Sequence, residues 1–85
     1  MTDINKTIEE RAKTHGDYAE NSRCFCALRE VMDNRELVLN ESQILGLTMI
    51  FSKIARILTG NPDEPDHWHD IAGFAILVER ELRKP

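Results

Sequence analysis

Cysteine is scarce in this chain, and its scarcity excludes one class of small protein. Only Cys24 and Cys26 are present. Residues two positions apart on a helix point to different sides and do not readily bridge each other, so a disulfide-stapled scaffold is excluded. Two small free thiols are typical of a reducing compartment. A metal site built on this CxC pair would need further ligands nearby, and none is evident.

Long hydrophobic runs are also missing. No apolar stretch approaches the roughly 20 residues that a helix needs to cross a bilayer. Residues 1–5 lack the basic and apolar regions of a signal peptide. We therefore expect a cytoplasmic protein without a membrane partner.

An excess of positive charge is lacking as well. The net charge of −4 argues against general nucleic-acid binding, which usually requires a basic face. A local basic cluster can still hold a small anion. The sequence also has no glycine-rich phosphate loop, no GxSxG elbow, no zinc-ligand spacing and no Ser/His/Asp arrangement.

What remains is typical of a small helical domain. The charged share of 31% and the hydrophobic share of 41% are ordinary for a globular chain. At 85 residues there is room for one core, so we expect a single domain over 1–85. No alternating strand pattern is present, and the predicted fold class is all-α, a small four-helix domain.

Two apolar stripes dominate the second half of the chain. They consist of Ile44, Leu47, Phe51, Ile54 and Leu58, and of Trp68, Ile71, Ala75, Val78 and Leu82. This spacing puts each stripe on one side of a helix. The short break at 60–65 predicts a long antiparallel hairpin of these two helices.

Capping signals set the expected helix boundaries. Asp17 with Glu20, and Asn40 with Gln43, have the spacing of capping boxes. Gly16 is suited to a left-handed exit from the first helix. The predicted helices span about 3–14, 17–33, 40–59 and 65–83. Residues 35–39 should form a loop anchored by two or three apolar side chains.

The two long helices also carry apolar residues away from their main stripes. Examples are Leu45 and Met49 on the first and Phe74 and Leu77 on the second. A helix that is apolar nearly all round is normally buried all round. In so short a chain, a second copy is the most plausible cover, so we predict a homo-oligomer.

Charged side chains interrupt the hairpin at matching heights. Lys53 and Arg56 share a face of one helix, and Asp66 and Asp70 share a face of the other. One interpretation is a set of interhelical salt bridges, which add little when exposed. The other is a polar pocket in which the carboxylates hold a divalent cation while the basic pair meets phosphate.

The histidines beside this pair do not form an obvious metal site. His67 and His69 are about 200° apart around a helix and cannot grip one ion together. We expect one to face solvent and the other to pack at an interface. Trp68 is better explained as core or interface than as a stacking platform, although it remains a candidate ligand-binding residue.

A second polar concentration lies near residues 11–23. Arg11 and His15 are one turn apart, and Asn21 follows at the start of the next helix. Amides at that helix start favour phosphate, and Tyr18 offers an aromatic face to a base. The alternative is a merely solvated helix junction.

Three segments carry a resemblance to a known family. These are Glu10–Tyr18, Lys53–Ile57 and Asp66–Ala75. Together they resemble a family of small phage and prophage proteins, and more distantly the MazG-type all-α nucleoside triphosphate pyrophosphohydrolases. That resemblance implies a MazG-like oligomeric fold, located in the host cytoplasm if the protein is phage-encoded. The enzymes hold Mg²⁺ with an ExxE pair on one helix and an ExxD pair on another.

Only part of that machinery carries over. Asp70 matches the final Asp of ExxD, but His67 stands where its Glu should be. Lys53 and Arg56 occupy the ExxE stretch, and Glu41 is isolated. Mg²⁺ requires several oxygen ligands, so the pattern favours holding a phosphate-bearing ligand over hydrolysing it.

We therefore predict a phage-type protein that sequesters a nucleotide, as an anti-defence sponge for a host immune signal such as a cyclic nucleotide or an ADP-ribose derivative. No catalytic residue and no cofactor are predicted. The predicted ligand-binding residues are Arg11, His15, Tyr18, Asn21, Lys53, Arg56, Trp68 and Asp70. The alternative is a MazG-like Mg²⁺-dependent pyrophosphohydrolase with Asp66 and Asp70 as metal ligands. A third option is a module whose apolar helical face binds a host protein.

Overall fold

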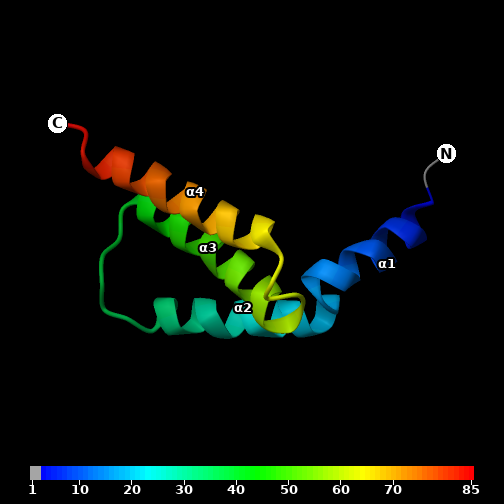
Figure 1. Cartoon of the computed structure of the whole chain (residues 1–85). Helices are drawn as coiled ribbons and strands as arrows, with labels where there is room; N and C mark the ends of the chain where they lie inside the picture. The colour runs from blue at the N-terminus through cyan, green and yellow to red at the C-terminus, as the bar shows by residue number, and fades with distance from the viewer. Residues whose placement is uncertain (1–2) are drawn as a thin grey trace.

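The computed structural model describes residues 3–85, in which there are four helices and no strand. The helices are α1 (Ile4–His15), α2 (Tyr18–Asp33), α3 (Glu41–Thr59) and α4 (Pro65–Leu82) (Figure 1). This confirms the all-α prediction, and each helix begins and ends within about two residues of its expected limits. None of the helices in this part of the chain is long and apolar enough to cross a membrane.

The helix starts follow the capping signals in the sequence. The Asn40 side chain accepts from the Gln43 amide at 2.8 Å, and the Gln43 side chain accepts from the Asn40 amide at 3.0 Å. At α2, Asp17 accepts from the Glu20 amide at 3.1 Å. The reciprocal bond predicted there is not formed, because the Glu20 carboxylate pairs with Arg23 instead.

The loop between α2 and α3 is less anchored than predicted. Leu37 and Val38 are 67% and 96% exposed, and only Leu39 is half-buried. The loop swings away from the helices before it returns to α3 (Figure 1). Its apolar side chains therefore have little to pack against.

Helix α3 is the centre of the molecule, because it alone contacts all three other helices. The hairpin of α3 and α4 is antiparallel, as predicted (Figure 1). Gly46 lies where the two helices meet, and a Cβ added there would be 2.3 Å from Val78 Cγ2. A close approach of α4 thus accounts for a glycine within a long helix.

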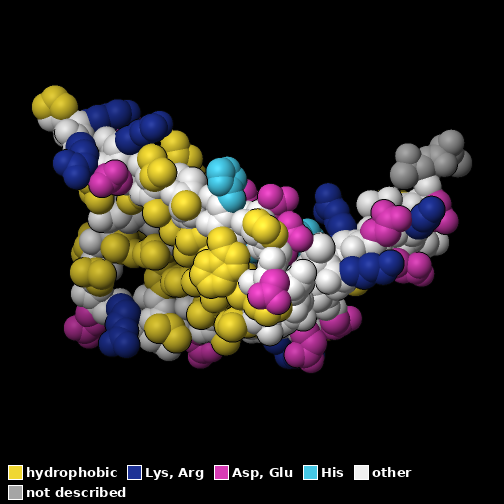
Figure 2. All heavy atoms as spheres, in the orientation of Figure 1, with side chains coloured by type: hydrophobic (Ala, Val, Ile, Leu, Met, Phe, Trp, Pro, Cys, Tyr) yellow, Lys and Arg dark blue, Asp and Glu magenta, His cyan; other side chains and the backbone are white. Residues whose placement is uncertain are grey.

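The core is thin. Ala55 and Ile57 are the buried hydrophobic residues of the described chain, although Ile57 lies off the predicted stripe. Of the stripe residues, five are exposed: Ile44, Leu58, Trp68, Ala75 and Leu82. Helices α2 and α4 lie against α3 without touching each other, so no element closes the space between them. Figure 2 shows hydrophobic side chains collected on this face.

Candidate functional site

The ends of α1 and α3 meet at a tight backbone contact, which we call the helix junction. Gly16 has a φ of +80°, and a Cβ added to it would be 2.2 Å from the Thr59 carbonyl oxygen. A Cβ on Gly60 would be 2.5 Å from the Thr14 carbonyl oxygen. Both positions therefore require glycine, and only Gly16 requires it for its backbone angle as well.

One carbonyl group ties the helix junction to α4. The Thr14 oxygen accepts from the Asn61 amide at 3.0 Å and from His67 Nε2 at 2.9 Å. Because a carbonyl only accepts, Nε2 carries the proton. His67 is 2% exposed while His69 is exposed, which confirms that one histidine packs at an interface and the other faces solvent.

A cavity of about 390 Å³ opens beside the helix junction. We call it the junction cavity; its walls are Ile8, Arg11, Ala12, His15, Gly16, Asp17, Tyr18, Asn21 and Arg56. The sequence placed Arg56 in a different group from Arg11 and His15. The structure brings them together because the end of α3 lies against the end of α1.

Two polar atoms in these walls have no hydrogen-bond partner. They are His15 Nδ1 and Asn21 Oδ1, both buried. The His15 ring lies 5.0 Å from the His67 ring. Burial lowers the pKa of His15, and the positive charges of Arg56, His67, Arg11 and Lys53 lower it further. The site therefore repels an additional proton and favours an anion.

The two arginines of the junction cavity have no carboxylate partner. Within residues 3–85, neither Arg11 nor Arg56 forms an ion pair. The nearby Asp17 carboxylate is used as the cap of α2. Tyr18, 84% exposed, stands at the edge of the cavity. The arrangement offers two free guanidinium groups and an accessible aromatic ring.

Lys53 and Asp70 join α3 to α4 by a salt bridge, as one interpretation of the sequence predicted. The distance from Lys53 Nζ to Asp70 Oδ2 is 3.1 Å, and the Lys53 side chain is only 13% exposed. The hydrogen bond from Lys53 lowers the pKa of Asp70. Asp66 is exposed and forms no ion pair within the described residues. The four charges therefore do not form one pocket, because Arg56 faces the junction cavity instead.

Trp68 lies outside the junction cavity. Its ring is 55% exposed, and its Nε1 donates to the Pro62 carbonyl at 2.8 Å. The side chain thus closes the turn between α3 and α4. Trp68 is therefore neither a core residue nor a wall of the junction cavity.

The carboxylates of α4 do not form a cage for Mg²⁺ within one chain. No group of three or more His, Cys, Asp or Glu side chains in residues 3–85 is arranged to hold a metal. Asp70 is engaged by Lys53, which leaves Asp66 without a second oxygen ligand beside it. Cys24 and Cys26 are both free.

Two apolar walls of the junction cavity were not identified from the sequence. Ile8 and Ala12 share one face of α1 with Arg11 and His15, since positions 8, 11, 12 and 15 follow the i, i+3, i+4, i+7 spacing of a helix face. That spacing was the signal in the sequence from which these two cavity walls could have been identified. The role of His67 had no comparable signal, because its partner is the backbone of a residue 53 positions away.

The chain matches a model of a protein family. The family model described as "Domain of unknown function (DUF6378)" matches residues 1–81. That span includes the helix junction and all but the last residue of α4. Among curated proteins and solved structures, nothing matches.

Proposed function

The chain belongs to the DUF6378 family, and from the junction cavity we propose that it binds a phosphate-bearing, nucleotide-type ligand. The observation that carries this proposal is the pair of unpaired arginines beside two unpartnered polar atoms. Arg11 and Arg56 line the same cavity as His15 Nδ1 and Asn21 Oδ1. Guanidinium groups bind phosphate oxygens in a bidentate manner.

Size and composition of the junction cavity support the same ligand class. Its volume of about 390 Å³ falls within the roughly 300 to 1,000 Å³ typical of small-molecule sites. Ile8 and Ala12 supply apolar surface, and the exposed Tyr18 ring is accessible for stacking on a base. Lys53 is not a wall of the cavity, but its positive charge is felt at His15, where it helps to lower the pKa.

The finer proposal is that the ligand is sequestered intact. The resemblance to phage and prophage proteins motivates a host nucleotide signal as the ligand, such as a cyclic nucleotide or an ADP-ribose derivative. What supports binding without cleavage is the lack of a carboxylate cage in the described residues. MazG-type hydrolysis would need oxygen ligands that this single chain does not bring together.

A binding experiment tests the proposal. Calorimetry with inorganic phosphate, AMP, ADP-ribose and a cyclic dinucleotide should identify at least one nucleotide that binds. Arg56→Gln and Arg11→Gln should each weaken it at least about tenfold, because a hydrogen bond to a charged group contributes about 1.5 to 3 kcal/mol. Lys13→Gln, which removes a charge outside the cavity, should leave binding unchanged.

The fate of the ligand separates the two hypotheses. The complex is heat-denatured and the released ligand is analysed by chromatography. Unchanged nucleotide supports sequestration, whereas cleaved product overturns it. Pyrophosphate release from nucleoside triphosphates in the presence of Mg²⁺ would support the enzyme alternative. If none of the nucleotides binds at millimolar concentration, the ligand proposal is wrong.

We also propose that the protein works as a homo-oligomer. Its exposed area is 6710 Å², whereas a monomeric globular protein of 9.8 kDa exposes about 5200 Å². Its radius of gyration is 14.9 Å, against about 12 Å for a compact domain of this length. Part of the excess comes from α1, which extends away from the other helices (Figure 1). Large apolar side chains that are exposed to solvent contribute to the rest of the excess area.

A further inference from the structure

The outer face of α4 carries a continuous stripe that is largely exposed, and Asp70 is the member that bonds to α3, through Lys53. Its members are spaced alternately by four and three residues: Asp66, Asp70, Gly73, Leu77, Arg80 and Lys84. That spacing keeps all six positions on one side of the helix, as in the seam of a coiled coil, although only Leu77 among them is a large apolar residue. Within the described residues, however, α4 packs along α3 alone, and it meets α1 only at its first turn, where His67 bonds to Thr14.

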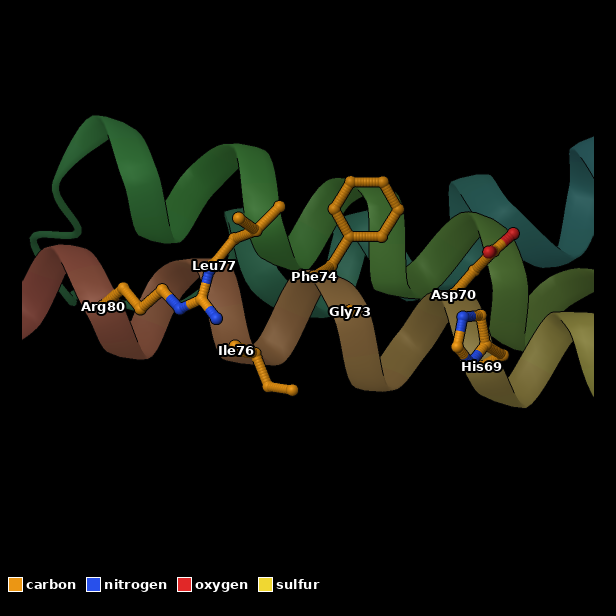
Figure 3. Close-up of a pocket in the computed structure, with 7 residues that line it drawn as sticks. All are labelled: His69, Asp70, Gly73, Phe74, Ile76, Leu77 and Arg80. Carbon is orange, nitrogen blue, oxygen red and sulfur yellow. The ribbon is translucent and has the colours of Figure 1, made fainter.

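The middle of the stripe is hollow. A groove of about 410 Å³ runs along α4. Figure 3 shows Phe74 and Leu77 on one side of it, Ile76 on the other, and Gly73 between them. A Cβ added to Gly73 would meet nothing within 4 Å, and Leu77 and Ile76 are 54% and 46% exposed. The groove therefore has room for an apolar side chain from outside.

The charges of the stripe are ordered along the helix. Asp66 and Asp70 lie towards its start, and Arg80 and Lys84 lie towards and beyond its end. In an antiparallel pair with the two-fold axis level with residue 75, position 70 faces 80 and position 66 faces 84. Acid then meets base at both ends, whereas a parallel pair would set acid against acid.

The same two-fold axis places a side chain of each copy opposite the groove of the other. Position 73 then faces position 77, so the Leu77 side chain of each copy enters the space above Gly73 of the other. A surface that complements itself in this way is the requirement for an isologous dimer. The 18 residues of α4 give a contact about 27 Å long.

The charged groups are available for this contact. Arg80 and Asp66 form no ion pair within the described residues. Asp70 holds Lys53 through one oxygen while its side chain stays 43% exposed. Lys84 is held by Glu81 at 2.6 Å, so the inner pair, Asp70 with Arg80, should contribute more than the outer one.

We propose that α4 pairs antiparallel with α4 of a second copy, with Gly73 and Leu77 at the centre and Asp70 facing Arg80 of the other chain. A standard interface buries about 800 Å² per partner. Helix α4 has to supply that area from its exposed side chains, among them Ile76, Leu77 and Leu82. This inference rests on the proposed self-association and is independent of the ligand.

Analytical ultracentrifugation of the full chain is the first test. The wild-type protein should sediment as a dimer or a multiple of a dimer at tens of micromolar. Arg80→Glu sets acid against Asp70 and should raise the dissociation constant at least about tenfold, since like charges brought together at an interface cost several kcal/mol. Arg35→Glu makes the same charge change in the α2–α3 loop and should have no effect.

Gly73→Leu tests the groove itself. In a single chain the added side chain enters open space, so circular dichroism should show an intact helical fold. In the dimer it occupies the space proposed for Leu77, so association should be lost. Retained association would overturn the interface.

Disulfide trapping tests the register. In a Cys24→Ser, Cys26→Ser background, chains with Gly73→Cys mixed with chains with Leu77→Cys should form a mixed disulfide. Gly73→Cys mixed with Glu79→Cys should not, because position 79 is on another side of α4.

The outcomes separate this inference from the proposals above. A monomer at 100 μM would overturn both self-association and the interface. An oligomer that tolerates Arg80→Glu and Gly73→Leu would overturn the interface alone. Arg80 is outside the junction cavity, so nucleotide binding by Arg80→Glu reports on the ligand proposal separately.

Discussion

The helix junction and the outer face of α4 are built in opposite ways. At the junction, backbone meets backbone so closely that Gly16 and Gly60 have no room for a Cβ, and His67 is 2% exposed. On the outer face of α4, Gly73 faces open space and large apolar side chains are about half exposed. The chain is therefore closely packed at the helix junction, whereas the outer face of α4 is left largely uncovered.

This difference indicates which side chains the fold itself holds in fixed positions. Around the junction cavity, the positions of His15 and Arg56 depend on a backbone contact that leaves little freedom. A ligand site gains affinity when its groups are held in place beforehand. The exposed apolar face has no such internal support, so its order should depend on a second copy.

The most damaging single change is expected at Gly16. Gly16→Ala combines a positive φ with a Cβ placed 2.2 Å from the Thr59 oxygen. The ψ of −176° puts Gly16 in a region that is essentially restricted to glycine, where another residue costs roughly 1 to 3 kcal/mol, and the clash adds to it. We expect a loss of about 3 kcal/mol or more, measured by urea unfolding. Lys13→Ala, an exposed neighbour, should change stability by less than about 0.5 kcal/mol; a tolerated Gly16→Ala would contradict the tight junction.

Removing the buried histidine should have the next largest effect. His67→Ala leaves a cavity and removes the bond to the Thr14 carbonyl, at a cost of about 2 to 3 kcal/mol. His69→Ala, two residues away and exposed, serves as the matched control and should be nearly neutral. Equal effects of the two changes would mean that His67 is not the residue that holds α1.

The contact between α3 and α4 should show a smaller, reversible effect. Gly46→Ala adds a Cβ 2.3 Å from Val78 Cγ2. Overpacking of a well-packed contact costs about 1 to 3 kcal/mol, offset by about 1 kcal/mol of helix propensity. We expect a net loss of about 1 kcal/mol. In a double-mutant cycle with Val78→Ala the two losses should not add; simple additivity would place Val78 elsewhere.

Acidification should produce the smallest change. The pKa of His15 is lowered from 6.5 in the folded chain, so below pH 6.5 the unfolded state binds more protons than the folded state. Stability is therefore greatest above that pH and falls as the solution is acidified through it. Urea unfolding at pH 7.5 and 5.5 should show this difference, and His15→Gln should reduce it. A bound phosphate should also reduce it, because the anion favours protonated His15.

Local signals in the sequence predicted much of this fold. The boundaries of α3 and α4 followed from Asn40, Gly60 and Pro65. A salt bridge between the basic pair of α3 and the acidic pair of α4 was one of two interpretations of their matched heights, and it forms between Lys53 and Asp70. These features depend on spacing along one helix or across one short turn. Such spacing is written directly in the sequence.

The spacing of residues along a helix does not determine how that helix is rotated against its neighbours. The sequence grouped Arg56 with Asp66, but the side of α3 that carries Arg56 faces α1. The predicted stripe on α3 also misplaced the centre of the core, which lies at Ala55 and Ile57. Both errors arise because α3 is packed on two sides, so more than one of its faces is apolar.

The Thr14 carbonyl holds α1, the interhelical turn and α4 together by accepting two bonds. Because the acceptor belongs to the main chain, every amino acid at position 14 supplies it. Replacing Thr14 would leave this fastening in place, and only the donors at positions 61 and 67 can release it. Proline at 61 or an apolar residue at 67 would therefore loosen α1 without altering any side chain that lines the cavity.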